Sequence, residues 1–97
     1  MSEPSADAGR VRLCVSGRVQ GVGFRWFVRE SARALDLAGW VRNQADGTVL
    51  LEARGDRAAL AALRTAVARG PSAAVVDRVV ELESHDLALP YPFAVER

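Results

Sequence analysis

Several residue types are scarce in this sequence, and each scarcity counts against a class of protein. The 97 residues include one cysteine, Cys14, and one histidine, His85, which is too few for an internal disulfide or a structural zinc site. None of the 13 basic residues is a lysine, and the net charge of +1 argues against a dedicated nucleic-acid binder. Apolar runs span only a few residues, so neither a membrane span nor a secretory signal is expected, and a reducing cytoplasm is the simplest compartment.

What the chain does contain is enough apolar sequence for one core. Hydrophobic residues make up 49% and charged residues 26%, which are ordinary values for a globular domain. At this length folding hides roughly 64% of the surface of the unfolded chain, so one core needs no metal or disulfide. Residues 1–9 are small, polar or acidic and are interpreted as a flexible tail. A single domain is expected over residues 10–97.

Hydrophobic periodicity divides this domain into strands and helices. Strands are expected at residues 11–16, 39–44, 49–53, 75–83 and 93–95, and helices at residues 24–35 and between Asp56 and Gly70. Doubled valines break the alternation of the fourth strand and indicate a bulge. The order is that of a ferredoxin-like α+β fold, with two helices on one face of an antiparallel sheet. This fold hosts many functions, so the function has to be argued from a site.

The most informative segment is the glycine-rich loop at residues 17–25, with the sequence GRVQGVGFR, which joins the first strand to the first helix. Unpaired amides and the helix dipole favour an anion there, and glycines let the backbone bend around it. Arg25 lies in the opening turn, where a cation is disfavoured by roughly 0.3–1 kcal/mol. A bound phosphate would reverse that penalty through a bidentate contact. The loop therefore suggests a phosphate site, and a simple tight turn is the alternative.

Asn43 is the second candidate. It lies late in the second expected strand, where asparagine is a poor strand former. Its amide can donate to an anion and accept a hydrogen bond from water. The alternative is that Asn43 only begins the turn toward Asp46-Gly47, which is a strong hairpin signal.

The remaining polar side chains are interpreted without a chemical role. Glu52 and Arg54 share one face of the third expected strand and are expected to face solvent. Cys14 is expected to be unreactive, on the sheet face opposite the core, and His85 is expected at the surface. No acidic group has metal-ligand spacing, so no metal site is expected.

Residues 17–25, with the sequence GWVRN at residues 39–43 and Asp46-Gly47, resemble the acylphosphatase family. The resemblance covers about residues 11–97 and includes the element order. It implies hydrolysis of a carboxyl–phosphate mixed anhydride to a carboxylate and inorganic phosphate, with no metal or cofactor. The implied partners are an acyl phosphate and, as product-like ligands, phosphate or sulfate. A monomer is the default expectation, and the charge and the short apolar runs predict no nucleic-acid and no membrane partner.

The resemblance also implies roles for individual residues. Arg25 and the loop amides bind the phosphate, and Asn43 orients the attacking water. The implied phosphate-binding residues are Arg18, Val19, Gln20, Gly21, Val22, Gly23, Phe24 and Arg25.

The absence of an evident general base, general acid or metal in the expected site limits its chemistry. The leaving group of a phosphate monoester is an alkoxide, which needs a general acid or a metal to leave. The leaving group of an acyl phosphate is a carboxylate, which is stable without such assistance. Positioning and charge stabilisation can then suffice for a loose transition state. A non-enzymatic module that binds a phosphorylated ligand is the competing class, but it would not need Asn43. An RNA-binding sheet would need exposed aromatics on central strands, and residues 11–16 contain none.

Overall fold

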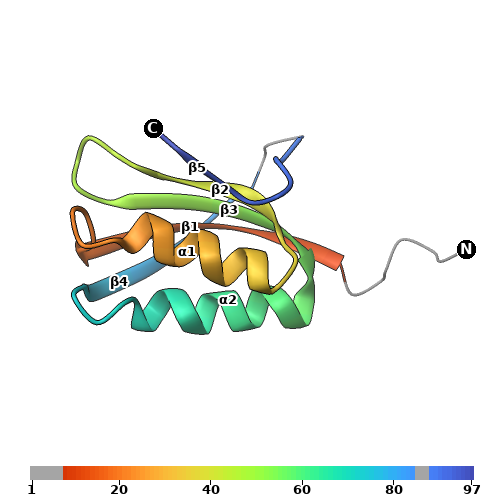
Figure 1. Ribbon diagram of the computed structural model, residues 1–97, viewed down its shortest axis with the longest axis horizontal. Coiled ribbons are helices and arrows are strands. Elements are labelled where there is room, and N and C mark those ends of the chain that lie inside the picture. The colour runs from red at the N-terminus through yellow and green to blue at the C-terminus, as the bar shows by residue number, and fades with distance from the viewer. Residues whose placement is uncertain (1–7, 85–87) are drawn as a thin grey trace, which may run out of the picture.

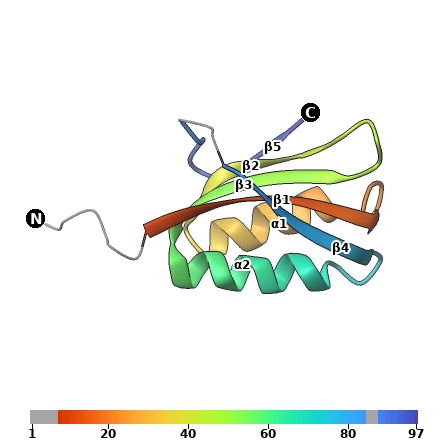
Figure 2. The ribbon, with the colours of Figure 1, turned by 180° about the vertical axis from the view of Figure 1, so that it is seen from behind.

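The computed structural model describes residues 8–84 and 88–97. Its elements are β1 (Ala8–Arg18), α1 (Phe24–Ala34), β2 (Ala38–Asn43), β3 (Val49–Asp56), α2 (Arg57–Arg69), β4 (Val75–Leu82) and β5 (Ala94–Glu96). The strands form one sheet in the order β4-β1-β3-β2-β5. Both helices lie side by side on one face of this sheet (Figures 1 and 2). The ferredoxin-like α+β fold expected from the sequence is confirmed.

The N-terminal boundary differs from the expected one. Ala8 and Gly9, which were assigned to the flexible tail, already belong to β1 and pair with Asp56 and Gly55. They are ordered because β3 is long enough to give them partners. Residues 1–7 lie outside the described part of the chain, as does His85.

The sheet is mixed, so the expectation of a purely antiparallel sheet is wrong at one edge. β5 pairs in parallel with β2, with Trp40 opposite Ala94 and Val41 opposite Val95. β4 and β5 occupy opposite edges of the sheet, so the chain crosses from one edge to the other between them. Such a crossover connection is what allows a strand to enter in parallel.

The main core lies between the sheet and the helices. Val11, Leu13 and Val15 of β1 are buried there, as their alternation predicts. The β1–β4 register shifts between Ser16 and Gly17, which confirms an irregularity in the fourth strand. Gly17 has a φ of 126°, and a Cβ at this position would lie 2.1 Å from the Val75 carbonyl oxygen. Only glycine fits at this point, where β1 approaches its end and the loop begins.

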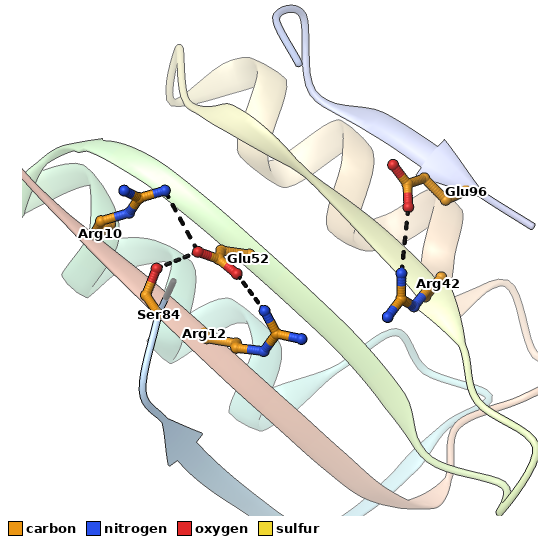
Figure 3. A network of polar contacts seen from close by, with 6 residues as sticks. All are labelled: Arg10, Arg12, Arg42, Glu52, Ser84 and Glu96. Carbon is orange, nitrogen blue, oxygen red and sulfur yellow. Dashed lines mark hydrogen bonds and ion pairs between the residues drawn. The ribbon is translucent and has the colours of Figure 1, made fainter. Parts of the chain in front are cut away.

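The opposite face of the sheet carries a buried ion network (Figure 3). Glu52 of β3 is completely buried, so the expectation that it faces solvent is wrong. Its carboxylate accepts a 2.8 Å hydrogen bond from Arg12 and a 3.5 Å one from Arg10, and Ser84 also donates to it. A carboxylate stays buried only with such partners. Arg54, on the same face, is exposed as expected.

Candidate active site

The loop between β1 and α1 presents the N-terminus of α1 without a side-chain cap. Gly23 is the N-cap residue, in the left-handed conformation with a φ of 78°, and no side chain bonds the free amides. The first turn contains no acidic residue. Amide groups in this position are oriented toward an anion and carry the positive end of the helix dipole. The backbone here is therefore suited to a negatively charged ligand.

A pocket of about 320 Å³ opens beside this helix terminus. It is lined by Val19, Gly21, Gly23, Phe24, Arg25, Trp26, Arg29, Asn43 and Val95. The loop and the β2–β3 hairpin lie at the same end of the molecule, which explains how residues distant in sequence meet here (Figure 1). Within the part of the chain that the structure describes, two arginines line the pocket and no carboxylate does. Its electrostatic character is therefore positive.

The pocket contains most, but not all, of the residues expected from the sequence. Arg18, Gln20 and Val22 are outside its lining; Arg18 is exposed, and Val22 packs against the core. A role for their backbone amides stays a prediction. The lining also includes three residues that sequence reasoning missed, namely Trp26, Arg29 and Val95.

Arg25 is partly buried and lies between the loop and the C-terminal strand. Its Nη1 donates a 3.4 Å hydrogen bond to the backbone oxygen of Glu96 in β5. β5 is in turn linked to β2 by the ion pair between Arg42 and Glu96, at 3.7 Å (Figure 3). Since a guanidinium has five N–H donors, this long contact leaves most of them available to a ligand.

Asn43 is the last residue of β2 and lines the same pocket. Its side-chain Oδ1 is buried and accepts no hydrogen bond from any described residue. The hairpin turn is closed by other groups: the Gln44 amide bonds the Thr48 oxygen, and the Asp46 carboxylate accepts from the Thr48 amide and hydroxyl. These bonds lower the pKa of Asp46. The turn thus forms without the Asn43 side chain. The buried Oδ1 acceptor of Asn43 is left for a ligand or water.

Gln20 joins the loop to this hairpin. Its Nε2 donates 2.8 Å hydrogen bonds to the backbone oxygens of Gln44 and Thr48. The Gln20 side chain therefore faces the hairpin and not the pocket. It holds the loop at a fixed position relative to Asn43.

Within residues 8–84 and 88–97, no three His, Cys, Asp or Glu side chains gather as they would around a metal ion. No helix in the same ranges is both long and apolar enough to span a membrane.

The fold and the pocket together define the class of this protein. It is a small α+β domain with a ferredoxin-like fold and an arginine-lined site, suited to an anion, at a helix N-terminus. A model of the acylphosphatase family matches residues 11–91. The acylphosphatase of Nitratidesulfovibrio vulgaris is 52% identical over 83 residues, covering 84% of this chain and 83% of that protein. The acylphosphatase of Salinibacter ruber is 56% identical over 70 residues, covering 72% of this chain and 74% of that protein.

A solved structure agrees with these sequence matches. The crystal structure of acylphosphatase from Bacillus subtilis aligns with a TM-score of 0.84 and 40% identity, covering 91% of this chain and 98% of that one. The chain therefore belongs to the acylphosphatase family, and the resemblance noted in the sequence is confirmed. Its activity is accordingly that of a hydrolase acting on acyl phosphates.

Proposed function

We propose that acyl phosphates are hydrolysed in this pocket without a metal ion or cofactor, with the phosphate bound by the loop and Arg25 and the water held by Asn43. The observation that carries the proposal is the buried Oδ1 of Asn43, which accepts no hydrogen bond from any described residue; Asn43 lines the same pocket as Gly21, Gly23 and Arg25. A binding module would gain nothing from this acceptor, whereas a hydrolase needs a group that orients water.

The phosphate is bound by the helix N-terminus and the arginine together. Backbone amides of residues 18–24 donate to its oxygens, and the planar guanidinium of Arg25 adds a bidentate contact. The glycine at the N-cap lets the backbone approach closely. Because these donors are in place before the substrate arrives, they stabilise the charge that the transition state spreads over the phosphoryl oxygens.

Asn43 positions the nucleophile. A water that donates to the Asn43 Oδ1 directs a lone pair at the phosphorus from the side opposite the leaving group. The water oxygen bonds to phosphorus, the bond from phosphorus to the acyl oxygen breaks, and its electron pair leaves on the carboxylate. One proton of the water passes to a phosphate oxygen, and the other stays on the oxygen that is now bonded to phosphorus. No general acid is required, because the leaving carboxylate is stable at neutral pH.

Chelation tests the metal-free mechanism. We expect hydrolysis of benzoyl phosphate to be unchanged in EDTA, because Arg25 and the loop amides supply the positive charge that a metal would otherwise provide. The measurement is kcat and KM before and after dialysis against chelator. A loss of activity that Mg²⁺ or Zn²⁺ restores would contradict the mechanism.

Inorganic phosphate is expected to be a competitive inhibitor, because product and substrate share the same donors. At about 100 times its Kd it stabilises the folded state by about 2.7 kcal/mol, which raises the Tm of a domain this size by about 10–20 °C. Steady-state inhibition and a melting curve measure the two effects, and sulfate is expected to act similarly. If phosphate in the millimolar range changes neither quantity, the loop is not the phosphate site.

We further propose that the chain from the start of β1 at Ala8 onward acts as one domain, as a monomer in the cytoplasm. The residues that line the pocket come from the β1–α1 loop, α1, β2 and β5 of this one domain. Gel filtration of the active enzyme measures the oligomeric state.

A further inference from the structure

We propose that Trp26, Arg29 and Val95 form an acyl subsite that favours acyl phosphates with an apolar body and a second negative charge. The inference rests on the proposed function, because it takes the phosphate to lie against the loop and Arg25. It concerns the part of the pocket that phosphate binding and water positioning leave unused.

The subsite lies next to the phosphate-binding residues on two different elements. Trp26 and Arg29 belong to α1 and Val95 to β5, and all three line the same pocket as Arg25 and Asn43. Arg29 follows Arg25 by four residues, so its backbone is about 6 Å farther along the helix from the phosphate end. An acyl group that extends from a bound phosphate along this helix would meet these side chains first.

Trp26 and Val95 supply the apolar part of the subsite. Trp26 is 61% exposed and Val95 38% exposed, although both are large hydrophobic side chains. Among the described residues, Trp26 stacks on no ring and no guanidinium. Trp40, in contrast, is buried and lies near Arg12 and Arg42, at 5.5 and 4.6 Å from their guanidinium carbons. The Trp26 ring is thus available to a flat apolar group, which would remove its surface from water.

Arg29 supplies the charge. Its ion pair is with the adjacent Glu30, at 3.7 Å, with both side chains substantially exposed. Neighbouring residues on a helix do not face each other, so this pair is weak. Among the described residues, no carboxylate lines the pocket, and the ion pair of Arg29 is the one with Glu30. A carboxylate or phosphate on the acyl group would therefore find a cation in the pocket lining that is held only by a weak ion pair.

Three substrates separate the two parts of the subsite. Acetyl phosphate has almost no acyl body, benzoyl phosphate adds a ring, and 4-carboxybenzoyl phosphate adds a carboxylate to that ring. Arg29→Gln is expected to lower the ratio of kcat/KM for 4-carboxybenzoyl over benzoyl phosphate by about fivefold, as for a partly exposed ion pair. Arg29→Lys should retain most of this ratio. Trp26→Ala is expected to lower the benzoyl-to-acetyl ratio by about fivefold.

Arg54→Gln is the matched control, since Arg54 is exposed and lies at the opposite end of the β2–β3 pair from Asn43. It removes the same charge and should leave both ratios at the parent values. If Arg29→Gln leaves the first ratio unchanged, while lowering turnover of both substrates and weakening phosphate inhibition, Arg29 binds the phosphate and the subsite is overturned. Unchanged ratios in both pocket variants, with normal turnover, also overturn it.

Failure of the subsite and failure of the proposed function give different results. The subsite fails when the ratios stay constant in an enzyme that hydrolyses acetyl phosphate and depends on Arg25. The proposed function fails when the parent protein does not hydrolyse acetyl phosphate, or when Arg25→Lys does not impair it.

Discussion

Replacing Arg25 by lysine is expected to lower kcat/KM for acyl phosphates by on the order of 10³-fold, the scale on which arginines stabilise phosphoryl transfer. Lysine keeps the charge but presents a point cation in place of a planar fork, so bidentate contact with the phosphate is lost. The inhibition constant of inorganic phosphate should rise in parallel, because the same contact holds product and substrate.

The control for this substitution is Arg54→Lys, which makes the same chemical change on an exposed arginine far from the pocket. It should match the parent in kcat/KM and in Tm. Arg25 makes one long hydrogen bond in the described part of the chain, to Glu96, so a melting curve should show Arg25→Lys to be folded. Activity within tenfold of the parent would remove Arg25 from the mechanism.

Replacing Asn43 by alanine is expected to lower kcat by about 10²–10³-fold, the cost of losing one preorganised polar group in an active site. The affinity for inorganic phosphate should stay close to the parent value, since Asn43 is proposed to hold the water and not the phosphate. The two variants therefore fail differently, and comparing kcat with the phosphate inhibition constant separates their roles.

Gln44→Ala serves as the matched control for Asn43→Ala, because it removes an amide from the same hairpin outside the pocket lining. The Asn43 Oδ1 accepts no hydrogen bond within the described residues, so its removal should leave the protein folded. Near-parent turnover of Asn43→Ala would contradict the water-positioning role. It would then favour an enzyme in which another group orients water.

Local signals were enough to predict most of the fold. The alternation of Val11, Leu13 and Val15 is a property of neighbouring residues, and so is the loop between β1 and α1. Glu52 shows where local signals end. Its burial depends on Arg12, which is 40 residues away in sequence, and on Ser84, which follows β4. The alternation of side chains along a strand assigns Glu52 to one face of the sheet. It does not predict which residues cover that face.

The residues of the candidate site, like the fold, were predictable from the sequence only where they leave a local signal. Arg25 and Asn43 stand out because each breaks a local preference, one for the sign of charge at a helix start and one for strand formation. Trp26 and Arg29 break no such preference, since aromatic and charged residues are ordinary on a helix. Val95 enters the pocket only because β5 lies parallel to β2, and this pairing across the chain has no signature in the residues near Val95.

The two hydrogen bonds of Gln20 have a consequence for how the molecule fluctuates. A glycine-rich loop would ordinarily open by itself, at little cost in free energy, and its amides would exchange with solvent independently of the rest of the protein. Because Gln20 bonds the backbone of Gln44 and Thr48, local opening of this loop also breaks bonds to the hairpin. We therefore expect the loop and the hairpin to open together, so that the amides of both segments are protected from exchange to a similar extent.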